Sequence, residues 1–364
     1  MKVLHVINSL GTGGAEKLLL DSIPLLNKSG ITADVALLDS ESYPFRDKLE
    51  ELNCCEIHIL SRRWKSVYNP LFIFKIIPFL YKYDIVHVHL FPAQYFVALA
   101  KILSSAKIKL IFTEHSTNNR RMVSPILRVL DKVIYIQYRK IVCISSKVKD
   151  VLMDKMKLPE QQLIVIENGI NLAIINNANA LKRSDFSYST DDCILIMVAA
   201  FRKEKDHYTL FKALQQLPPK YKLILVGDGE RKKELTNLSD NLGLRKRINF
   251  LGVRSDIPEL IKMSDIAILS SHWEGFGLAA AEAMAAGIPV IASNVEGLSQ
   301  VVADGGILFK KGNVQELHDQ IVKLSTDSVF YKKTSHNGIV KSRLYDIQIL
   351  IDKSVKLYKE IYNG

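Results

Sequence analysis

The chain has 364 residues, of which 48% are hydrophobic and 24% are charged, and its formal net charge is +11. This composition excludes a disordered or fibrous protein, and the length favours two domains over one. The four cysteines show neither metal-ligand spacing nor a paired framework, which predicts a compartment where thiols stay reduced. The first apolar run ends at the glycines of 11–14, too early for a signal peptide or a membrane span, so we expect a cytoplasmic protein.

The positive charge is greater in the first half of the chain. It has three interpretations, namely a solvated surface, attraction to anionic lipid head groups, and attraction to the phosphates of a substrate. No nucleic-acid partner is predicted, because the sequence has no recognition-helix, zinc or aromatic-platform motif.

Short apolar, β-branched runs alternate with segments of helical period along the chain, which predicts βαβ units on parallel sheets. A first series has strand-like runs at 3–8, 33–38, 84–90, 108–113, 140–145 and 163–168, and a second at 193–200, 222–227, 248–252, 265–270 and 289–293. The segment 168–190 lacks a sustained period and suits an interdomain connection. An amphipathic helix is expected near the C-terminal end. We therefore predict two domains, 1–169 and 170–345, followed by a helix in 346–364.

A glycine-rich loop, GTGGAE at 11–16, follows the first predicted strand and opens a helix. Glycines let backbone N–H groups approach a phosphate or a sugar, and the helix N-terminus adds partial positive charge. A dinucleotide fingerprint needs Gly or Ala at its sixth position, where this chain has Glu16. The loop therefore favours phosphate or sugar contact at Gly13 and Gly14 over NAD binding, although a tight turn alone would also need glycines.

A second glycine-containing segment, SHWEGFGLAAAEAMAAGIPV at 271–290, joins two predicted strands through a helix. Gly275 and Gly277 open the backbone where the helix begins, so N–H groups and the helix dipole can receive a pyrophosphate. Glu282 lies about a turn and a half inside the helix, where a carboxylate can accept both hydroxyls of a ribose. Glu274 precedes the helix and can reach a sugar. An alanine-rich, closely packing helix is a poor place for a carboxylate without function.

This segment is similar to the E-x7-E signature of the retaining glycosyltransferase family 4, whose members have the GT-B fold. Other pieces agree in order and spacing: the GTGGAE loop, TEHS at 113–116, ENGIN at 167–171, FRKEKD at 201–206, VGDG at 226–229 and FLG at 250–252. The resemblance implies an α/β protein with two Rossmann-like domains facing a central cleft. The first would bind the acceptor and the second the nucleotide-sugar, with the C-terminal helix crossing back to the first.

The resemblance also implies roles for single residues. Glu282 would hold the donor ribose, Glu274 would contact the transferred sugar, and N–H groups around Phe276, Gly277 and Leu278 would meet the pyrophosphate. Glu274 is thus one of two candidate catalytic residues.

Lys205 matches the lysine that such enzymes place on the donor phosphates. Fixed cations stabilise the charge that develops on a leaving diphosphate, so we expect no metal and no other cofactor. The family usually has an arginine five residues before that lysine, where this chain has Ala200, and Arg202 is the nearest substitute. For both Lys205 and Arg202 the alternative is a basic loop that faces water.

His115, the other candidate catalytic residue, follows a predicted strand at the end where open α/β sheets bind ligands. Similar enzymes often have a histidine there, which can bind a donor-sugar hydroxyl or accept a proton. The alternative is a structural loop histidine. His87 and His89 lie two apart on one strand face, which favours packing or a supporting role. Asn168 and Gly169 resemble a hinge, although a simple turn would look the same.

Basic and large apolar residues are combined between positions 62 and 82. Such a stretch can rest on an anionic membrane, which would suit a polyprenyl-diphosphate-linked acceptor. Alternatively it is a buried helix of the first domain, since Pro78 would interrupt an amphipathic face. Arg120 and Arg121 are candidate contacts for an acceptor diphosphate or simply exposed charge.

The sequence therefore predicts a transferase that moves a hexosyl or N-acetylhexosaminyl unit from a UDP- or GDP-sugar to a glycan or lipid-linked acceptor. The expected setting is surface polysaccharide or glycolipid assembly in the cytoplasm, on the inner face of the cell membrane if 62–82 makes contact. Retention is implied by the resemblance alone.

Three alternatives stay open. The E-x7-E pattern disfavours a GT-B nucleotide-sugar epimerase, and a phosphorylase would need a pyridoxal-phosphate lysine motif that is not evident. A non-catalytic nucleotide-sugar-binding protein is favoured by Ala200 and disfavoured by the presence of both Glu274 and Glu282.

Overall fold

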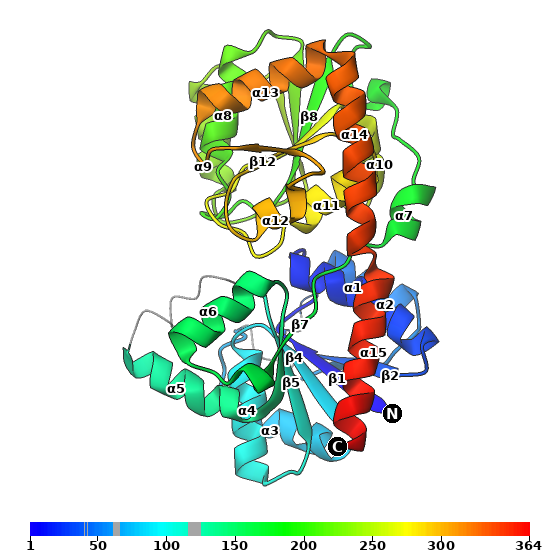
Figure 1. Ribbon diagram of the computed structural model, residues 1–364, viewed down its shortest axis with the longest axis vertical. Coiled ribbons are helices and arrows are strands. Elements are labelled where there is room, and N and C mark those ends of the chain that lie inside the picture. The colour runs from blue at the N-terminus through cyan, green and yellow to red at the C-terminus, as the bar shows by residue number, and fades with distance from the viewer. Residues whose placement is uncertain (40, 42, 61–65, 116–124) are drawn as a thin grey trace. The chain divides into compact units, whose positions relative to one another are not determined.

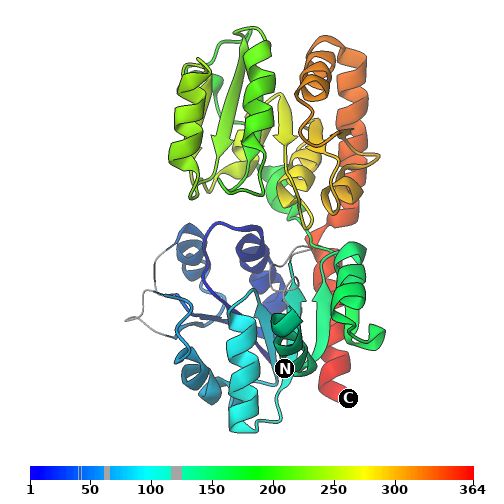
Figure 2. The same ribbon diagram turned by 90° about the vertical axis from the view of Figure 1, so that its left-hand side faces the viewer.

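A computed structural model describes residues 1–39, 41, 43–60, 66–115 and 125–364 (Figure 1). The chain forms two compact units by internal contacts. Unit 1 comprises Met1–Gly169 with Ile347–Gly364, and unit 2 comprises Ile170–Asp346. Both chain ends therefore belong to unit 1 (Figures 1 and 2).

The described part of unit 1 contains a parallel sheet of seven strands in the order β3-β2-β1-β4-β5-β6-β7. The central strands are apolar and buried along nearly their whole length, as expected for a parallel sheet covered by helices on both faces. The strands are β1 Lys2–Ile7, β2 Thr32–Leu37, β3 Ile57–Ile59, β4 Ile85–His89, β5 Lys109–Glu114, β6 Tyr138–Cys143 and β7 Leu163–Val165.

The helices of unit 1 connect these strands. They are α1 Gly14–Lys28, α2 Pro44–Glu51, α3 Phe72–Ile76, α4 Ala93–Ser104, α5 Pro125–Ile136, α6 Ser146–Met156 and α15 Ile347–Asn363, with 3-10 turns η1 Ile77–Tyr81 and η3 Glu160–Gln162. Helix α15 packs against α1 (Figure 1). Its apolar face, which includes Ile347, Ile351 and Leu357, is part of the hydrophobic core under β1 and β2.

The described part of unit 2 contains a second parallel sheet, of six strands in the order β10-β9-β8-β11-β12-β13. Its strands are β8 Cys193–Val198, β9 Tyr221–Val226, β10 Ile248–Gly252, β11 Ile266–Leu269, β12 Val290–Ser293 and β13 Ile307–Phe309. Its helices are α7 Leu172–Asn177, α8 His207–Gln216, α9 Lys232–Asn241, α10 Ile257–Met263, α11 Leu278–Ala285, α12 Leu298–Val302, α13 Val314–Thr326 and α14 Ser328–Ser342, with turns η4 Arg183–Phe186 and η5 Arg343–Tyr345. Helix α13 packs on α8, and α14 packs on α11.

Two short strands are additions to the predicted pattern. Strands β3 and β13 have three residues each, which is too short for a hydrophobic period to show in the sequence. Both pair at a sheet edge, β3 with β2 and β13 with β12.

The chain passes between the units twice, at 169–170 and at 346–347. The two passages lie side by side, because the Ile170 N–H donates to the Tyr345 carbonyl at 2.8 Å. A Cβ at Gly169 would come within 2.5 Å of the Ile347 Cα, so this close approach requires glycine. Within the described ranges, no helix combines the length and the apolarity that crossing a bilayer would require.

Candidate active site

Two loops of unit 2 are joined by backbone hydrogen bonds at the carboxyl ends of β8 and β11. The Asp206 N–H donates to the Ser270 carbonyl at 3.0 Å, and the His272 N–H donates to the Glu204 carbonyl at 2.8 Å. The Ser270 hydroxyl also donates to the Asp206 carbonyl at 2.8 Å. This pairing brings the loop that carries Lys205 beside the loop that carries Glu274.

Lys205 and Glu274 form an ion pair between Nζ and Oε2. Their side chains are only 16% and 19% exposed, so the two charges are partly withdrawn from water. The pair fixes the position of the lysine, and an anionic group that binds Lys205 would have to share it with Glu274 or replace that carboxylate. The sequence predicted both residues as ligands of the donor, and the structure brings them into contact.

The N-terminus of α11 follows directly on this pair. Gly277 precedes the helix at φ +94°, a backbone conformation that favours glycine, and a Cβ there would also require the Leu298 side chain to move. The first N–H groups of a helix have no partner inside the helix, and they carry partial positive charge. Leu278 is the first residue of α11, while Phe276 is buried with its ring edge-on to Tyr345 at 5.2 Å.

The two acidic residues of the motif differ in position. Glu274 lies before α11 in contact with Lys205, and Glu282 lies in the second turn of the helix, half-buried. Arg202 is exposed in the loop after β8, three residues before Lys205. Among the predicted donor ligands of unit 2, the structure brings Lys205 and Glu274 into direct contact.

Three glycines hold the neighbouring loops against this site. A Cβ at Gly297, at φ +83°, would come within 2.3 Å of the Glu274 carbonyl oxygen. Gly227 and Gly229, at φ +139° and +159°, would place a Cβ at 2.1 Å from the Ala199 carbonyl oxygen and 2.6 Å from the Phe201 carbonyl oxygen. Sequence reasoning missed Gly297. At Gly227 and Gly229 the close approach of neighbouring backbone explains why glycine is required.

In unit 1 the predicted loop glycines lie at the start of α1. Gly13 precedes the helix and Gly14 begins it. The carboxylate of Glu16 lies over Gly13, with Oε2 at 2.3 Å from the position of a Cβ. A glutamate at the third helical position commonly turns back to the helix N-terminus in this way. An anion approaching Gly13 and Gly14 would therefore have to displace that carboxylate, which weakens the predicted phosphate contact.

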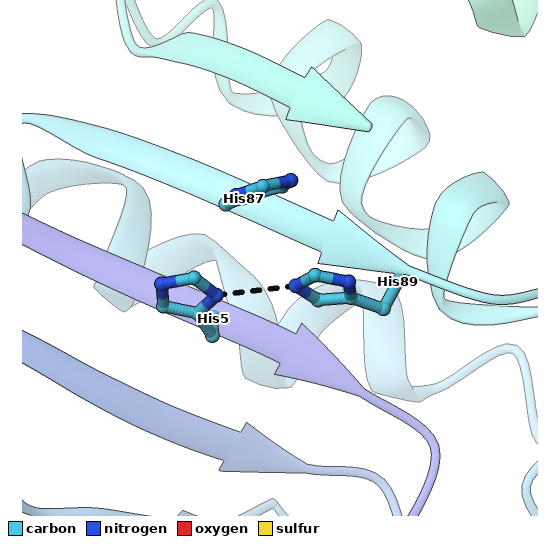
Figure 3. A group of neighbouring side chains, drawn as sticks. All are labelled: His5, His87 and His89. Carbon is cyan, nitrogen blue, oxygen red and sulfur yellow. Dashed lines mark hydrogen bonds between the residues drawn. The ribbon is translucent and has the colours of Figure 1, made fainter. Parts of the chain in front are cut away.

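His115 follows β5 in a cluster of histidines. Its Nε2 lies 3.3 Å from His89 Nδ1. His89 Nε2 in turn lies 3.1 Å from His5 Nδ1, and Figure 3 shows this second contact. Burial lowers the pKa of His115 to about 4 and that of His5 to about 3, and it holds the pKa of His89 well below its ordinary value. These rings are therefore neutral at pH 7. The supporting role predicted for His89 agrees with this position, whereas His5 was missed.

The ring nitrogens of His5, His87 and His89 lie close enough together to hold a metal ion. However, His87 contacts the Tyr358 hydroxyl and the Thr113 hydroxyl, each at 2.7 Å. Both nitrogens of His89 also have partners. A metal would have to replace these hydrogen bonds, so the cluster is better described as a hydrogen-bond network. The predicted acceptor contacts Arg120 and Arg121 lie outside the described residues.

Comparisons with known proteins place this fold in a class. The architecture matches Anabaena HepE in complex with UDP-glucose, at a TM-score of 0.87 and 24% identity over 99% of this chain and 100% of that chain. It also matches WaaG, a glycosyltransferase involved in lipopolysaccharide biosynthesis, at a TM-score of 0.76 and 15% identity over 98% and 99% of the two chains. Two Rossmann-like units with these neighbours define the GT-B class, as the sequence predicted.

Sequence profiles identify the family. The profile described as Glycosyltransferase Family 4 matches residues 12–174, and the one described as Glycosyl transferases group 1 matches 180–341. The chain belongs to glycosyltransferase family 4 and is a glycosyltransferase. The predicted family and the predicted enzyme class, a glycosyltransferase, are thereby confirmed.

Two curated relatives are similar along nearly the whole chain. One is the UDP-Gal:alpha-D-GlcNAc-diphosphoundecaprenol alpha-1,3-galactosyltransferase of Escherichia coli, 26% identical over 98% of this chain and 96% of the relative. The other is the N-acetylgalactosamine-N,N'-diacetylbacillosaminyl-diphospho-undecaprenol 4-alpha-N-acetylgalactosaminyltransferase of Campylobacter jejuni, 23% identical over 93% and 94%.

Proposed function

We propose that this enzyme transfers a hexosyl or N-acetylhexosaminyl unit from a UDP-sugar to a polyprenyl-diphosphate-linked or glycan acceptor. The observation that carries the proposal is the contact of Lys205 with Glu274 beside the N-terminus of α11. A cation and helix N–H groups suit a diphosphate, and a carboxylate suits sugar hydroxyls. The names of the two relatives and the UDP-glucose bound by HepE support the donor and acceptor classes.

In the proposed reaction the bond between the anomeric carbon and the donor phosphate breaks, and its electron pair leaves with UDP. Lys205 and the N–H groups at the start of α11 stabilise the developing negative charge. An acceptor hydroxyl attacks the face that the phosphate leaves, and its proton passes to the departing phosphate oxygen. The anomeric configuration is then retained. Because protein groups supply the positive potential, we expect no metal cofactor.

When the donor binds, Lys205 and Glu274 separate from each other and contact different parts of the donor. Lys205 turns to the diphosphate and Glu274 accepts hydrogen bonds from the sugar hydroxyls, while Glu282 accepts those of the ribose. Arg202, exposed at the same strand end, is a second cation for the phosphates. His115 is proposed to contact a substrate hydroxyl.

Peripheral contact with an anionic membrane is the second part of the proposal. Apolar side chains of α3 and the adjoining turns alternate between the core and solvent: Phe72 and Ile76 are buried, whereas Tyr68, Phe74 and Tyr81 are more than 60% exposed. Lys75 and Lys82 are exposed beside them. Aromatic and basic side chains together suit the head-group region of an anionic bilayer.

Co-sedimentation tests this surface. The wild type is expected to sediment with phosphatidylglycerol vesicles and not with phosphatidylcholine vesicles, and the double variant Phe74→Ser/Tyr81→Ser is expected to stay in the supernatant. Equal sedimentation of the wild type and this variant would count against the surface.

A thermal-shift panel tests the donor. UDP, GDP, ADP and their common sugar conjugates are added separately to the full chain with EDTA present. We expect a shift with UDP and UDP-sugars, and its loss in Glu282→Gln, because ligand binding to the folded state alone raises its stability. Glu360→Gln, on an exposed position of α15, is the matched control. A selective shift with GDP would overturn the choice of base, and no shift with any nucleotide would overturn the site.

A further inference from the structure

Three histidine rings in unit 1 form a continuous chain from the middle of β1 to the end of β5. His5 Nδ1 lies 3.1 Å from His89 Nε2, and His89 Nδ1 lies 3.3 Å from His115 Nε2. Figure 3 shows His5 and His89 pointing toward one another from β1 and β4. Because His89 occupies Nε2 of His115, only Nδ1 of His115 can meet a substrate.

The hydrogen bonds between the three rings restrict which ring nitrogens can carry a proton. Each N···N contact needs one N–H donor and one bare nitrogen, and a neutral imidazole carries a single proton. The three rings are neutral at pH 7 because burial keeps their pKa values low. If His115 carries its proton on Nε2, His89 and His5 must do so as well. If His115 carries it on Nδ1, all three must carry it on Nδ1.

The surroundings of His5, the ring farthest from His115, distinguish these two arrangements of protons. His5 Nε2 is buried and has no hydrogen-bond partner among the described residues, and the same holds for Ser22 Oγ and Asn168 Oδ1. All three residues line one cavity of about 40 Å³. A water needs roughly 10–15 Å³ of such space, so ordered water can join these atoms.

The balance of donors and acceptors in this cavity favours the first arrangement. Of the three lining atoms named above that have no hydrogen-bond partner in the described part of the chain, Asn168 Oδ1 is a pure acceptor, a bare His5 Nε2 would be a second, and the Ser22 hydroxyl would be the one donor. A protonated His5 Nε2 supplies a donor for that acceptor, directly or through water. A buried polar group without a partner is costly, so the protonated form is preferred.

We propose that His89, supported by His5, is a positioning residue that holds His115 as its Nε2–H tautomer. Nδ1 of His115 is then a bare acceptor for the hydrogen of a substrate hydroxyl. The inference about the substrate rests on the proposed function, whereas the inference about the tautomer rests on the hydrogen-bond chain alone.

Nuclear magnetic resonance of the full chain labelled with ring-¹⁵N histidine tests the tautomer directly. The nine histidines make this label sparse enough to assign by single substitutions. We expect His5, His89 and His115 all as Nε2–H tautomers between pH 6 and 8. Three Nδ1–H rings, or mixed tautomers along the chain, would overturn the proposal.

Two substitutions of His89 separate positioning from packing. His89→Leu fills the site but offers no acceptor, so His115 is expected to lose its single tautomer. In His89→Asn the side-chain oxygen can take the place of Nδ1, and the Nε2–H tautomer of His115 is expected to return. Tyr358→Phe is the control, because it removes the hydroxyl that contacts His87 and keeps both nitrogen-to-nitrogen contacts among His5, His89 and His115. An unchanged His115 spectrum in His89→Leu would contradict the role of His89.

Kinetics then connect the tautomer with the reaction. His89→Leu should lower kcat by roughly tenfold, as expected for the loss of one oriented hydrogen bond, while KM for the UDP-sugar stays within about twofold. His89→Asn should recover most of kcat. If His115→Ala leaves kcat unchanged while the tautomers are as expected, the proposed role of His115 is wrong and the hydrogen-bond chain stands. If His89→Leu does not fold, the wild-type and His89→Asn spectra still decide the question.

Discussion

Lys205 and Glu274 form an ion pair although 69 positions separate them in the sequence. The contact exists because the two loops that carry them are hydrogen-bonded to each other along the backbone. A lysine held in this way can exchange its carboxylate partner for a phosphate with little rearrangement, which is the arrangement that charge stabilisation in a transition state requires.

The first prediction concerns this lysine. Lys205→Ala should lower kcat by roughly 10²- to 10³-fold, the usual effect of removing one group that stabilises transition-state charge. UDP release measures the rate. Lys203→Ala is the matched control, because Lys203 is exposed in the same loop. Equal rates for the two variants would show that Lys205 is not a phosphate ligand.

Single residues of the site were predictable to different degrees. Lys205, Glu274 and Glu282 stand in motifs, so their sequence context made them candidates, but no periodicity could reveal that the first two are in contact. His5 lies in the middle of an apolar strand and reads as core, because its partner His89 becomes visible only once β1 and β4 pair. His115 carried the one usable signal of this cluster, namely its place at a strand end.

At the scale of elements, glycines decide how closely the loops around α11 approach one another. Gly297 precedes α12 and lies against the Glu274 carbonyl, so this loop fixes the chain just before α11. The arrangement makes the geometry of the candidate donor site depend on Gly297, a residue with no proposed ligand contact.

The second prediction therefore compares two glycines. Gly297→Ala combines a left-handed φ with a Cβ at 2.3 Å from the Glu274 carbonyl oxygen, whereas Gly312→Ala has a similar φ and open space. We expect Gly312→Ala to lower the free energy of unfolding by about 1 kcal/mol and Gly297→Ala by clearly more, within roughly 1–3 kcal/mol. Urea unfolding of both variants measures the difference. Equal losses would show that the close contact relaxes freely.

Long elements with a regular hydrophobic pattern were predictable from the sequence, whereas short elements were not. The helix near the C-terminus was expected from its amphipathic pattern, and α15 does bury its apolar face, but the pattern could not show which surface it covers. The stretch near 62–82 illustrates the other limit. Its described part is a short helix, α3, followed by the 3-10 turn η1 that contains Pro78, so both the buried and the exposed interpretations apply to alternate side chains.

At the scale of the whole molecule, neutral buried histidines make stability depend on pH. His5, His87 and His89 have pKa values lowered by burial, so the unfolded chain binds more protons than the folded one below about pH 6.5. Stability is therefore fully present above the unfolded pKa and is lost as the pH falls toward the folded pKa.

The third prediction follows from this direction of the pH dependence of stability. Between pH 7.5 and pH 5.5 the free energy of unfolding should fall by up to about 1.4 kcal/mol for each such histidine. Urea unfolding at the two pH values measures the fall, and His5→Leu should show a smaller fall than the wild type. Stability that rises on acidification would contradict the neutral state of these rings.

The fourth prediction concerns metal. Activity in UDP release should be the same with and without EDTA, because Lys205 and the N-terminus of α11 are expected to stabilise the leaving diphosphate without a cation. Loss of activity in EDTA that Mg²⁺ restores would show that a metal takes part.

The family, the fold and the enzyme class followed from sequence motifs, whereas the identity of the transferred sugar depends on a few hydroxyl contacts that no motif encodes.

The return of α15 to unit 1 has a consequence for how such enzymes recombine. Unit 2 is topologically an insertion in unit 1, because chain segments on both sides of it build one hydrophobic core. A single crossover near residue 170 would import a foreign terminal helix that was never selected to fit α1. A chimera that exchanges only the second unit therefore needs two junctions, at 169–170 and 346–347. We expect the first and last segments of these genes to be inherited together, separately from the segment that encodes unit 2.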